Sequence, residues 1–242
     1  MDRSASGYNA RMHRFFVDKV PAERAFLTGD QARQIATVLR LKPGEHVVLV
    51  ADGTEHEVEL QAVATAQVTG KVVARRAVMT ELAFGLTLAI PVLKGDRSEE
   101  IVEATTQLGV LRFVPFTSER SIVRELTTTK RDRWAKIARE AAETSHRGAV
   151  PSIEGLVPLS ALLQMLDRPI VLWEEATEPR LVEVARTVDV ALVVGPEGGL
   201  TADEVALART RGATIASLGR RIMRAETAAI AAVAMVVGAR DR

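Results

Sequence analysis

Residues 193–204 read VVGPEGGLTADE, and this stretch decides the fold. An apolar β-branched run, typical of a buried strand, leads into a glycine-rich turn. Glycine lets a ligand approach the main chain closely, and Pro196 stiffens the turn. Thr201 followed by Glu204 is the pattern of a capping box, which predicts that a helix starts here. Strand, glycine loop and helix together predict a binding site, because ligands of open α/β sheets bind at the carboxyl ends of the strands.

The glycine loop matches neither common phosphate-binding motif. No lysine follows the glycines as in a P-loop, and the GxGxxG spacing of a dinucleotide fold is missing. Glu197 would also repel a phosphate at close range, so we expect a ligand that is neutral or cationic at the point of contact. Alternatively, the glycines only form a turn. Residues 218–228, LGRRIMRAETA, repeat the design of glycine loop before helix and favour a site.

At these two stretches the sequence resembles the bacterial enzymes that methylate N3 of a uridine in small-subunit ribosomal RNA, within the SPOUT methyltransferase superfamily. The resemblance rests on several ordered motifs and extends over roughly the whole chain. Met223 stands where this family usually has leucine, which is a volume-conserving exchange. The matching segments are 13–17, 38–40, 94–97, 108–110, 119–121, 140–141, Arg147 with Pro151, 195–199 with Glu204, 218–219, 222–224 and 226–228.

Composition indicates a globular protein of 242 residues, long enough for one large or two ordinary domains. The chain has no cysteine, which excludes disulfides and thiol chemistry and suits a reducing compartment. Its four histidines are scattered without ligand spacing, so we expect no metal. No apolar run approaches 18 residues, and the N-terminus is polar. We therefore expect no membrane span or signal peptide, and a cytoplasmic location.

The distribution of charge says more about partners than the net charge of +1 does. Residues 209–225 contain five arginines and no acid, and residues 130–147 contain six basic residues against three acids. Such runs are most often ordinary solvated faces. Because these segments flank the glycine loops, they favour an anionic polymer as partner.

The periodicity changes near residues 77–83 and predicts two domains after a flexible tail at residues 1–12. Residues 13–77 read as short strands with turns, including a hairpin around Asp52-Gly53 and one amphipathic helix at 30–40. This pattern suggests a small barrel, and the resemblance implies a PUA-like RNA-binding β-barrel. Residues 84–242 alternate strands and helices, which predicts an α/β domain with a mostly parallel sheet. The resemblance implies that this is a SPOUT methyltransferase domain with a C-terminal trefoil knot.

The resemblance also implies the cofactor, S-adenosyl-L-methionine, held by three loops near residues 172–175, 195–199 and 218–224. Glycines expose the backbone groups that recognise adenine, and apolar side chains supply walls. Glu197 lies either near the cationic end of the ligand or in a cap of the turn, and Trp173 is expected in the core. The expected cofactor-binding residues are Leu172, Glu174, Gly195, Pro196, Glu197, Gly198, Gly199, Leu218, Gly219, Ile222, Met223, Arg224, Thr227 and Ala228.

The implied reaction moves a methyl group from a sulfonium to a ring nitrogen. N3 of uridine must lose its proton first, and a nearby arginine favours the resulting anion. Arg224 and Glu197 are the candidate catalytic residues, although Arg224 has the alternative role of an ion pair with Glu226. No histidine or lysine stands in a motif that names a general base, so positioning would supply much of the rate. The target base must be unpaired or flipped, since N3 lies on its Watson–Crick edge.

The expected partner is 16S ribosomal RNA in an assembled small subunit, and a homodimer is expected through the apolar helix at 225–238. Phe15 and Phe16 are expected in the core. Three positions depart from the family pattern, Gln34, Gln107 and Thr144, and bear on RNA contacts more than on the cofactor. A related enzyme acting on a ribose 2′-hydroxyl or transfer RNA, and an RNA-binding protein without catalysis, remain alternatives. The expected RNA contacts are Arg14, Arg40, Lys94, Arg97, Arg120, Arg139 and Arg147.

Overall fold

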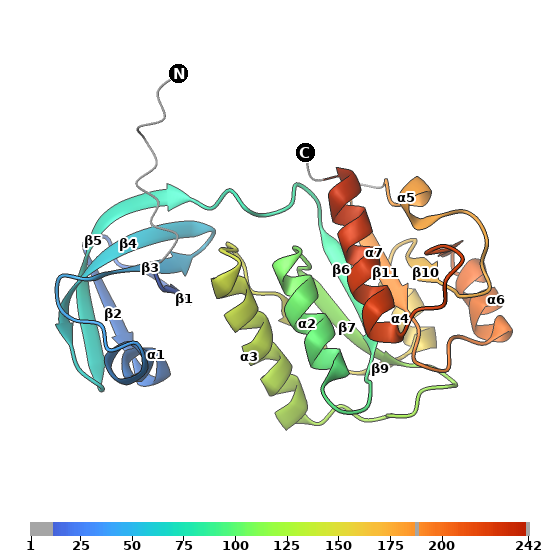
Figure 1. The fold of residues 1–242 in the computed structure, drawn as a ribbon, viewed down its shortest axis with the longest axis horizontal. Coiled ribbons are helices and arrows are strands. Elements are labelled where there is room, and N and C mark those ends of the chain that lie inside the picture. The colour runs from blue at the N-terminus through green and yellow to red at the C-terminus, as the bar shows by residue number, and fades with distance from the viewer. Residues whose placement is uncertain (1–11, 187–188, 241–242) are drawn as a thin grey trace, which may run out of the picture. The chain divides into compact units, whose positions relative to one another are not determined.

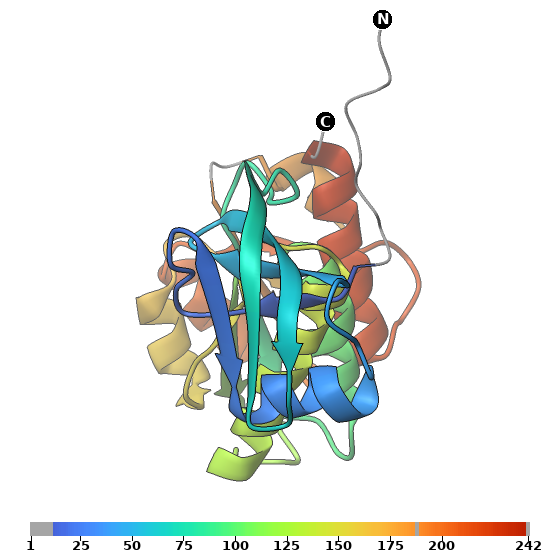
Figure 2. The same cartoon turned by 90° about the vertical axis from the view of Figure 1, so that its left-hand side faces the viewer.

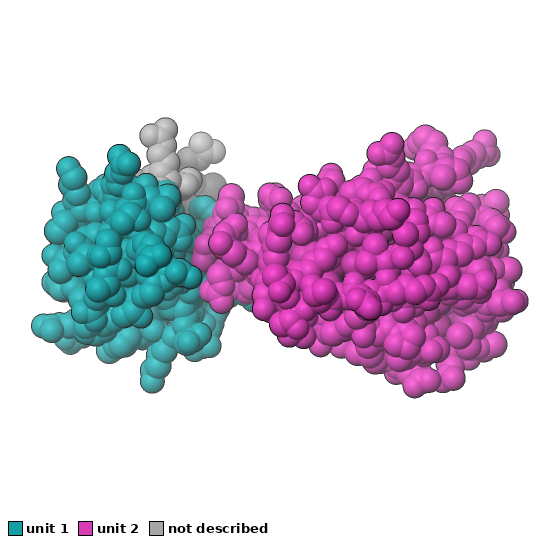
Figure 3. Space-filling view, turned by 90° about the horizontal axis from the view of Figure 1, so that it is seen from below, with its two compact units in different colours: residues 1–80, 146–149 teal, residues 81–145, 150–242 magenta. Residues whose placement is uncertain are grey.

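The computed structural model describes residues 12–186 and 189–240, so the predicted tail, apart from Met12, lies outside the described residues. The chain forms two compact units, coloured separately in Figure 3. Unit 1 comprises residues 1–80 and 146–149, and unit 2 comprises residues 81–145 and 150–242. The short segment 146–149 therefore belongs to unit 1, although the residues on both sides of it belong to unit 2.

Unit 1 is built on a five-stranded sheet in the order β1-β3-β4-β5-β2, seen in Figure 2. Among the described strands of this sheet, β1 and β3 pair in parallel and the other pairs are antiparallel. Asp52 and Gly53 join β3 to β4 with positive φ angles of 47° and 67°, which is the predicted tight hairpin. Phe15 and Phe16 are both buried, as expected. The strands are β1 (Arg14–Phe16), β2 (Arg24–Thr28), β3 (His46–Ala51), β4 (Thr54–Val63) and β5 (Gln67–Ala77).

The amphipathic helix predicted at residues 30–40 is confirmed only in part, because the helical segment covers residues 29–38 and is not α-helical throughout. The chain forms one α-helical turn, α1 (Gly29–Arg33), and then a π-helical turn, η1 (Gln34–Val38). Ile35 is fully buried, whereas Val38, which was placed on the same face, is exposed. A π-helical turn has more residues per turn than an α-helix, so it rotates Val38 away from the apolar face.

Unit 2 contains a sheet in the order β12-β10-β11-β6-β7-β8, with β9 also pairing to β7 (Figure 1). Every recorded strand pair in it is parallel, which confirms the predicted α/β class with a parallel sheet. The strands are β6 (Leu86–Pro91), β7 (Arg112–Thr117), β8 (Ser152–Ile153), β9 (Val157–Pro158), β10 (Ile170–Leu172), β11 (Val190–Val194) and β12 (Thr214–Ala216). The helices are α2 (Arg97–Gln107), α3 (Thr128–Thr144), α4 (Leu159–Met165), α5 (Leu181–Val184), α6 (Ala202–Thr210) and α7 (Ala225–Arg240).

Two apolar cores cover the two faces of this sheet. In β11, Leu192 and Val194 pack in the core formed with α2, α3, α5 and α7, while Val193 packs in the core formed with α4 and α6. Successive side chains of a strand point to opposite faces, so a strand covered on both sides must be apolar throughout. This explains the continuous apolar run at residues 190–194, and it leaves the ends of the strands as the place for a site.

Helix α7 is apolar because the chain's own core covers it. Ala229, Ala232, Val233 and Val236 are buried, and the helix packs against α2, α5 and β11. The sequence analysis expected this apolar helix to form a dimer contact. Packing within one chain explains most of its apolar composition. Among the described residues, no helix combines the length and apolar character that crossing a bilayer requires.

Candidate functional site

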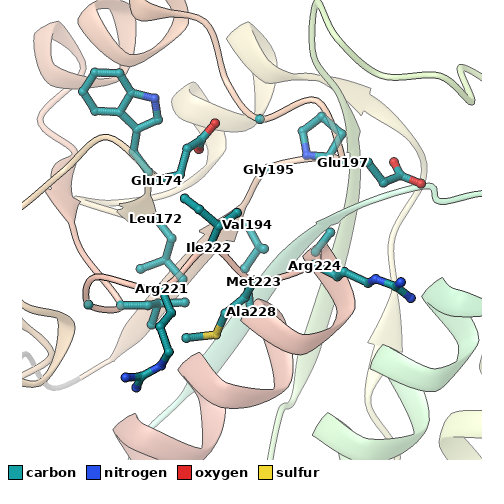
Figure 4. Close-up of a pocket in the computed structure, with 16 residues that line it drawn as sticks. Leu172, Glu174, Val194, Gly195, Glu197, Arg221, Ile222, Met223, Arg224 and Ala228 are labelled. Carbon is teal, nitrogen blue, oxygen red and sulfur yellow. The ribbon is translucent and has the colours of Figure 1, made fainter.

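A cavity of about 360 Å³ opens where β10, β11 and β12 end, shown in Figure 4. These three strands are neighbours, and Leu172 stands in register with both Val194 and Ala216. The chain leaves each strand into a loop, and the three loops line the cavity. The predicted position at the carboxyl ends of parallel strands follows directly from this register.

The first glycine loop is fixed by local hydrogen bonds. The amide of Gly199 donates to the carbonyl of Pro196 at 2.9 Å, and Gly199 has a φ of +70°. Thr201 then caps α6, since its hydroxyl accepts from the Glu204 amide at 3.2 Å and the Glu204 carboxylate accepts from the Thr201 amide at 2.9 Å. The second Glu204 oxygen accepts from the Glu119 amide at 2.7 Å. The predicted capping box is therefore present, and it also ties the loop after β7 to this site.

Most residues expected to bind the cofactor line the cavity. Gly198 and Thr227 do not. The carbonyl of Gly198 instead accepts from the Arg120 guanidinium at 3.0 Å, and Thr227 is exposed on α7. The residues that line it as expected are Leu172, Glu174, Gly195, Pro196, Glu197, Gly199, Leu218, Gly219, Ile222, Met223, Arg224 and Ala228.

Trp173 was expected in the core, and the structure shows a half-buried wall residue instead. It packs against the core under α4 and α6 and also lines the cavity. Among the described residues, its Nε1 has no hydrogen-bond partner although the atom is buried. Its place between Leu172 and Glu174 was the signal that could have identified it. The other lining residues that the sequence analysis missed are Val194, Arg221 and Ala225.

Glu197 and Arg224 have different surroundings. Arg97 donates from Nη2 to Glu197 Oε1 at 2.7 Å, an ion pair that neither sequence-based alternative for Glu197 included. Arg224 is exposed and does not form the anticipated ion pair with Glu226, whose partner is Arg97 at 4.0 Å. Within residues 12–186 and 189–240, no acidic side chain pairs with Arg224. Its positive charge is thus available to a ligand.

Two of the residues expected to contact RNA are buried, and this corrects the expectation for them. Arg14 is 5% exposed and pairs with Glu55, and its Nη2 donates to the Arg147 carbonyl at 3.2 Å. Arg147 is itself only 2% exposed. Their guanidinium groups therefore face protein and not solvent. The exposed members of the predicted set are Arg40, Lys94, Arg120 and Arg139, and Arg97 is half-buried.

Comparison with known proteins places this chain in a family. The sequence profile of an RNA methyltransferase domain matches residues 80–237. The ribosomal RNA small subunit methyltransferase E of Bacillus subtilis is 32% identical over 245 residues, covering 93% of this chain and 96% of that protein. The chain belongs to the ribosomal RNA small subunit methyltransferase E family. The family resemblance seen in the sequence motifs is thereby confirmed.

Solved structures of two bacterial proteins described as methyltransferases share the fold. The enzyme of Neisseria gonorrhoeae, bound to S-adenosyl methionine, has a TM-score of 0.86 and 27% identity, covering 92% of this chain and 95% of that one. A presumed methyltransferase from Legionella pneumophila, solved with the bound cofactor SAM, has a TM-score of 0.88 and 27% identity. That match covers 95% of this chain and 98% of the other.

Proposed function

We propose that this member of the methyltransferase E family transfers a methyl group from S-adenosylmethionine to N3 of one uridine in 16S ribosomal RNA. The observation that carries the proposal is that three loops line one cavity, and two of these loops contain the most specific family motifs. The relatives' names support small-subunit ribosomal RNA as the substrate class. A ribosomal substrate would also place the activity in the cytoplasm.

The cavity suits S-adenosylmethionine in size and chemistry. Its volume of about 360 Å³ lies within the usual range for small-ligand sites. Leu172, Val194 and Met223 line the cavity and offer an apolar slot for adenine. Glu174 places a carboxylate on the rim. When bound, the sulfonium of this cofactor supplies an electrophilic methyl group.

The residues of the chain then have to prepare the uridine. Arg224 and Arg221 are exposed residues that line the cavity, and their guanidinium groups point outward from it (Figure 4). A fixed positive charge beside N3 lowers the cost of removing its proton, so we assign Arg224 to stabilise the uridine anion. Because N3 is hidden in a base pair, the base must enter the cavity unpaired or flipped.

The remaining assignments concern the whole chain. We assign residues 13–77 to a PUA-like RNA-binding barrel and residues 84–242 to a SPOUT domain with a trefoil knot. The curled five-stranded sheet supports the first assignment. For the knot, the support is the family resemblance of residues 195–199 and 218–228. We also propose a homodimer acting on an assembled subunit, for which light scattering should give twice the 26.2 kDa chain mass.

The test is methylation of small ribosomal subunits, assembled and as naked RNA, followed by mass spectrometry of the nucleosides. We expect N3-methyluridine at one position, with assembled subunits as the better substrate. Label in a ribose 2′-O-methyl nucleoside, or in transfer RNA alone, would assign the chain to a related reaction. Calorimetry that detects no S-adenosylmethionine binding would favour an RNA-binding protein without catalysis.

A further inference from the structure

Arg97, the first residue of α2, lies between two walls of the cavity. Its Nη2 donates to Glu197 Oε1 at 2.7 Å, and its Nη1 lies 4.0 Å from Glu226 Oε2. Its Nε donates to the Lys94 carbonyl at 3.3 Å. The Arg97 side chain is 32% exposed, and its guanidinium has these three partners on different sides.

The two acids belong to different walls. Glu197 is part of the loop after β11, whereas Glu226 lies on the first turn of α7, directly after the loop that follows β12. Glu197 and Arg224 are labelled on these two walls in Figure 4. One side chain from a third segment, the start of α2, therefore bridges both walls.

Glu226 makes this bridge necessary. The residue is 7% exposed, and among the described residues its Oε2 has no hydrogen-bond partner. Burying a carboxylate is costly unless a counter-charge is near, and Arg97 supplies a counter-charge for Glu226. Loss of Arg97 would leave a buried negative charge without its counter-charge at the start of α7, and this favours a shift of that wall.

We propose that Arg97 is a positioning residue for the cofactor: by pairing with Glu197 and Glu226 it sets the separation of the two walls that grip S-adenosylmethionine. The inference rests on the proposed function of the cavity. It replaces the expectation that Arg97 contacts RNA, since both Nη atoms already face carboxylates. The two roles differ in one measurable respect, because a wall-positioning residue affects cofactor binding without any RNA present.

The experiment is titration calorimetry of S-adenosylmethionine into the RNA-free full chain. Arg97→Met should weaken binding about 10-fold, within the range usual for coupling between neighbouring groups. Arg97→Lys should recover part of the loss, because a compact ammonium cannot bridge two carboxylates as a planar fork does. Arg209→Met removes an exposed arginine from α6 and is the matched control, with wild-type affinity expected.

A double-mutant cycle tests the bridge itself. Glu226→Gln should weaken binding, and Arg97→Met combined with Glu226→Gln should be no weaker than Arg97→Met alone, because contacting residues are not additive. If Arg97→Met unfolds the chain, the Arg97→Lys and Glu226→Gln variants decide the question. Unchanged cofactor affinity in these variants, with a raised KM for RNA, would overturn the proposal. A wild-type chain that fails to bind the cofactor would instead overturn the proposed function.

Discussion

Arg224 lines the cavity and is exposed, and its guanidinium has no acidic partner in the described part of the chain. Replacing it with methionine keeps the aliphatic stem and removes the charge. We expect Arg224→Met to lower the single-turnover methylation rate by about 10²-fold, the usual effect of losing one group that stabilises developing charge. Raising the pH should recover part of the rate, since base then removes the N3 proton without this help.

Arg220→Met is the matched control, because Arg220 is exposed in the same loop but does not line the cavity. It should retain the wild-type rate at saturating cofactor and RNA. Both variants should melt at the wild-type temperature, since neither side chain is buried. Equal rate losses in the two variants would show that the loop acts only through its overall charge, and the role assigned to Arg224 would be wrong.

The glycine loop after β11 has a backbone conformation and a close contact that disfavour a side chain at Gly199. Gly199 has a φ of +70°, and a Cβ there would lie 1.9 Å from Oε1 of Glu174. Alanine at this position costs about 1–2 kcal/mol in backbone strain, and the Glu174 side chain must also move. We expect Gly199→Ala to lower cofactor affinity well beyond its effect on stability, measured by calorimetry beside thermal melting.

Gly212→Ala separates these two effects. Gly212 has a similar φ of +82°, and nothing lies within 4 Å of its would-be Cβ. This variant should lose similar backbone stability and keep wild-type affinity for the cofactor. If both variants bind the cofactor equally well, the contact between the loop and Glu174 has no part in binding.

Elements were predictable where one local pattern decided them. The apolar run of β11 and the capping box of α6 are local signals, and the structure has both. Strand β2 alternates apolar and polar residues over only five positions, and α4 has seven residues, less than two full helical turns, so neither pattern was recognised. Such short segments are stabilised by tertiary packing more than by their own periodicity.

The site, too, was predictable only where a local sequence motif marked it. The loops that line the cavity follow the strands and could be inferred from motifs. The pair of Arg97 with Glu197 spans 100 residues, and no local spacing reveals it. The same reason explains the error over Arg14, whose buried partners are Glu55 and the carbonyl of Arg147, 133 residues away. Charge in a sequence motif does not show whether a side chain faces solvent or another part of the chain.

At the scale of the whole chain, the buried Arg14–Glu55 pair holds a distant segment in unit 1. Arg14 contacts both the Glu55 carboxylate and the carbonyl of Arg147, and Arg76 also donates to Glu55. Thr80 donates to the carbonyl of His146 at 2.6 Å. Segment 146–149, which lies between two parts of unit 2 in the sequence, is therefore fixed to unit 1 by charge and by hydrogen bonds.

The cluster formed by Arg14, Glu55 and Arg76 makes the stability of unit 1 depend on pH. Burial raises the pKa of Glu55, but the hydrogen bonds and charges of Arg14 and Arg76 more than offset this and hold the pKa below 4.5. The unfolded chain thus takes up this proton first, so the stabilisation is complete above pH 4.5 and is lost as the pH falls further. Burial and the charge of Arg75 lower the pKa of His56 below 6.5, so acid begins to destabilise the unit below that pH.

Glu55→Gln should remove the lower of these two acid transitions. It should also weaken unit 1 at neutral pH by about 3 kcal/mol, because two guanidiniums lose the carboxylate that they share. Both tryptophans lie in unit 2, so the measurement is hydrogen exchange of peptides from β3 to β5, corrected for the intrinsic effect of pH. Glu59→Gln on β4 is the control and should keep the wild-type transition. If the Glu55→Gln variant also keeps the lower acid transition, the acid sensitivity of unit 1 arises elsewhere. The charge of Glu55 would then not be what holds segment 146–149.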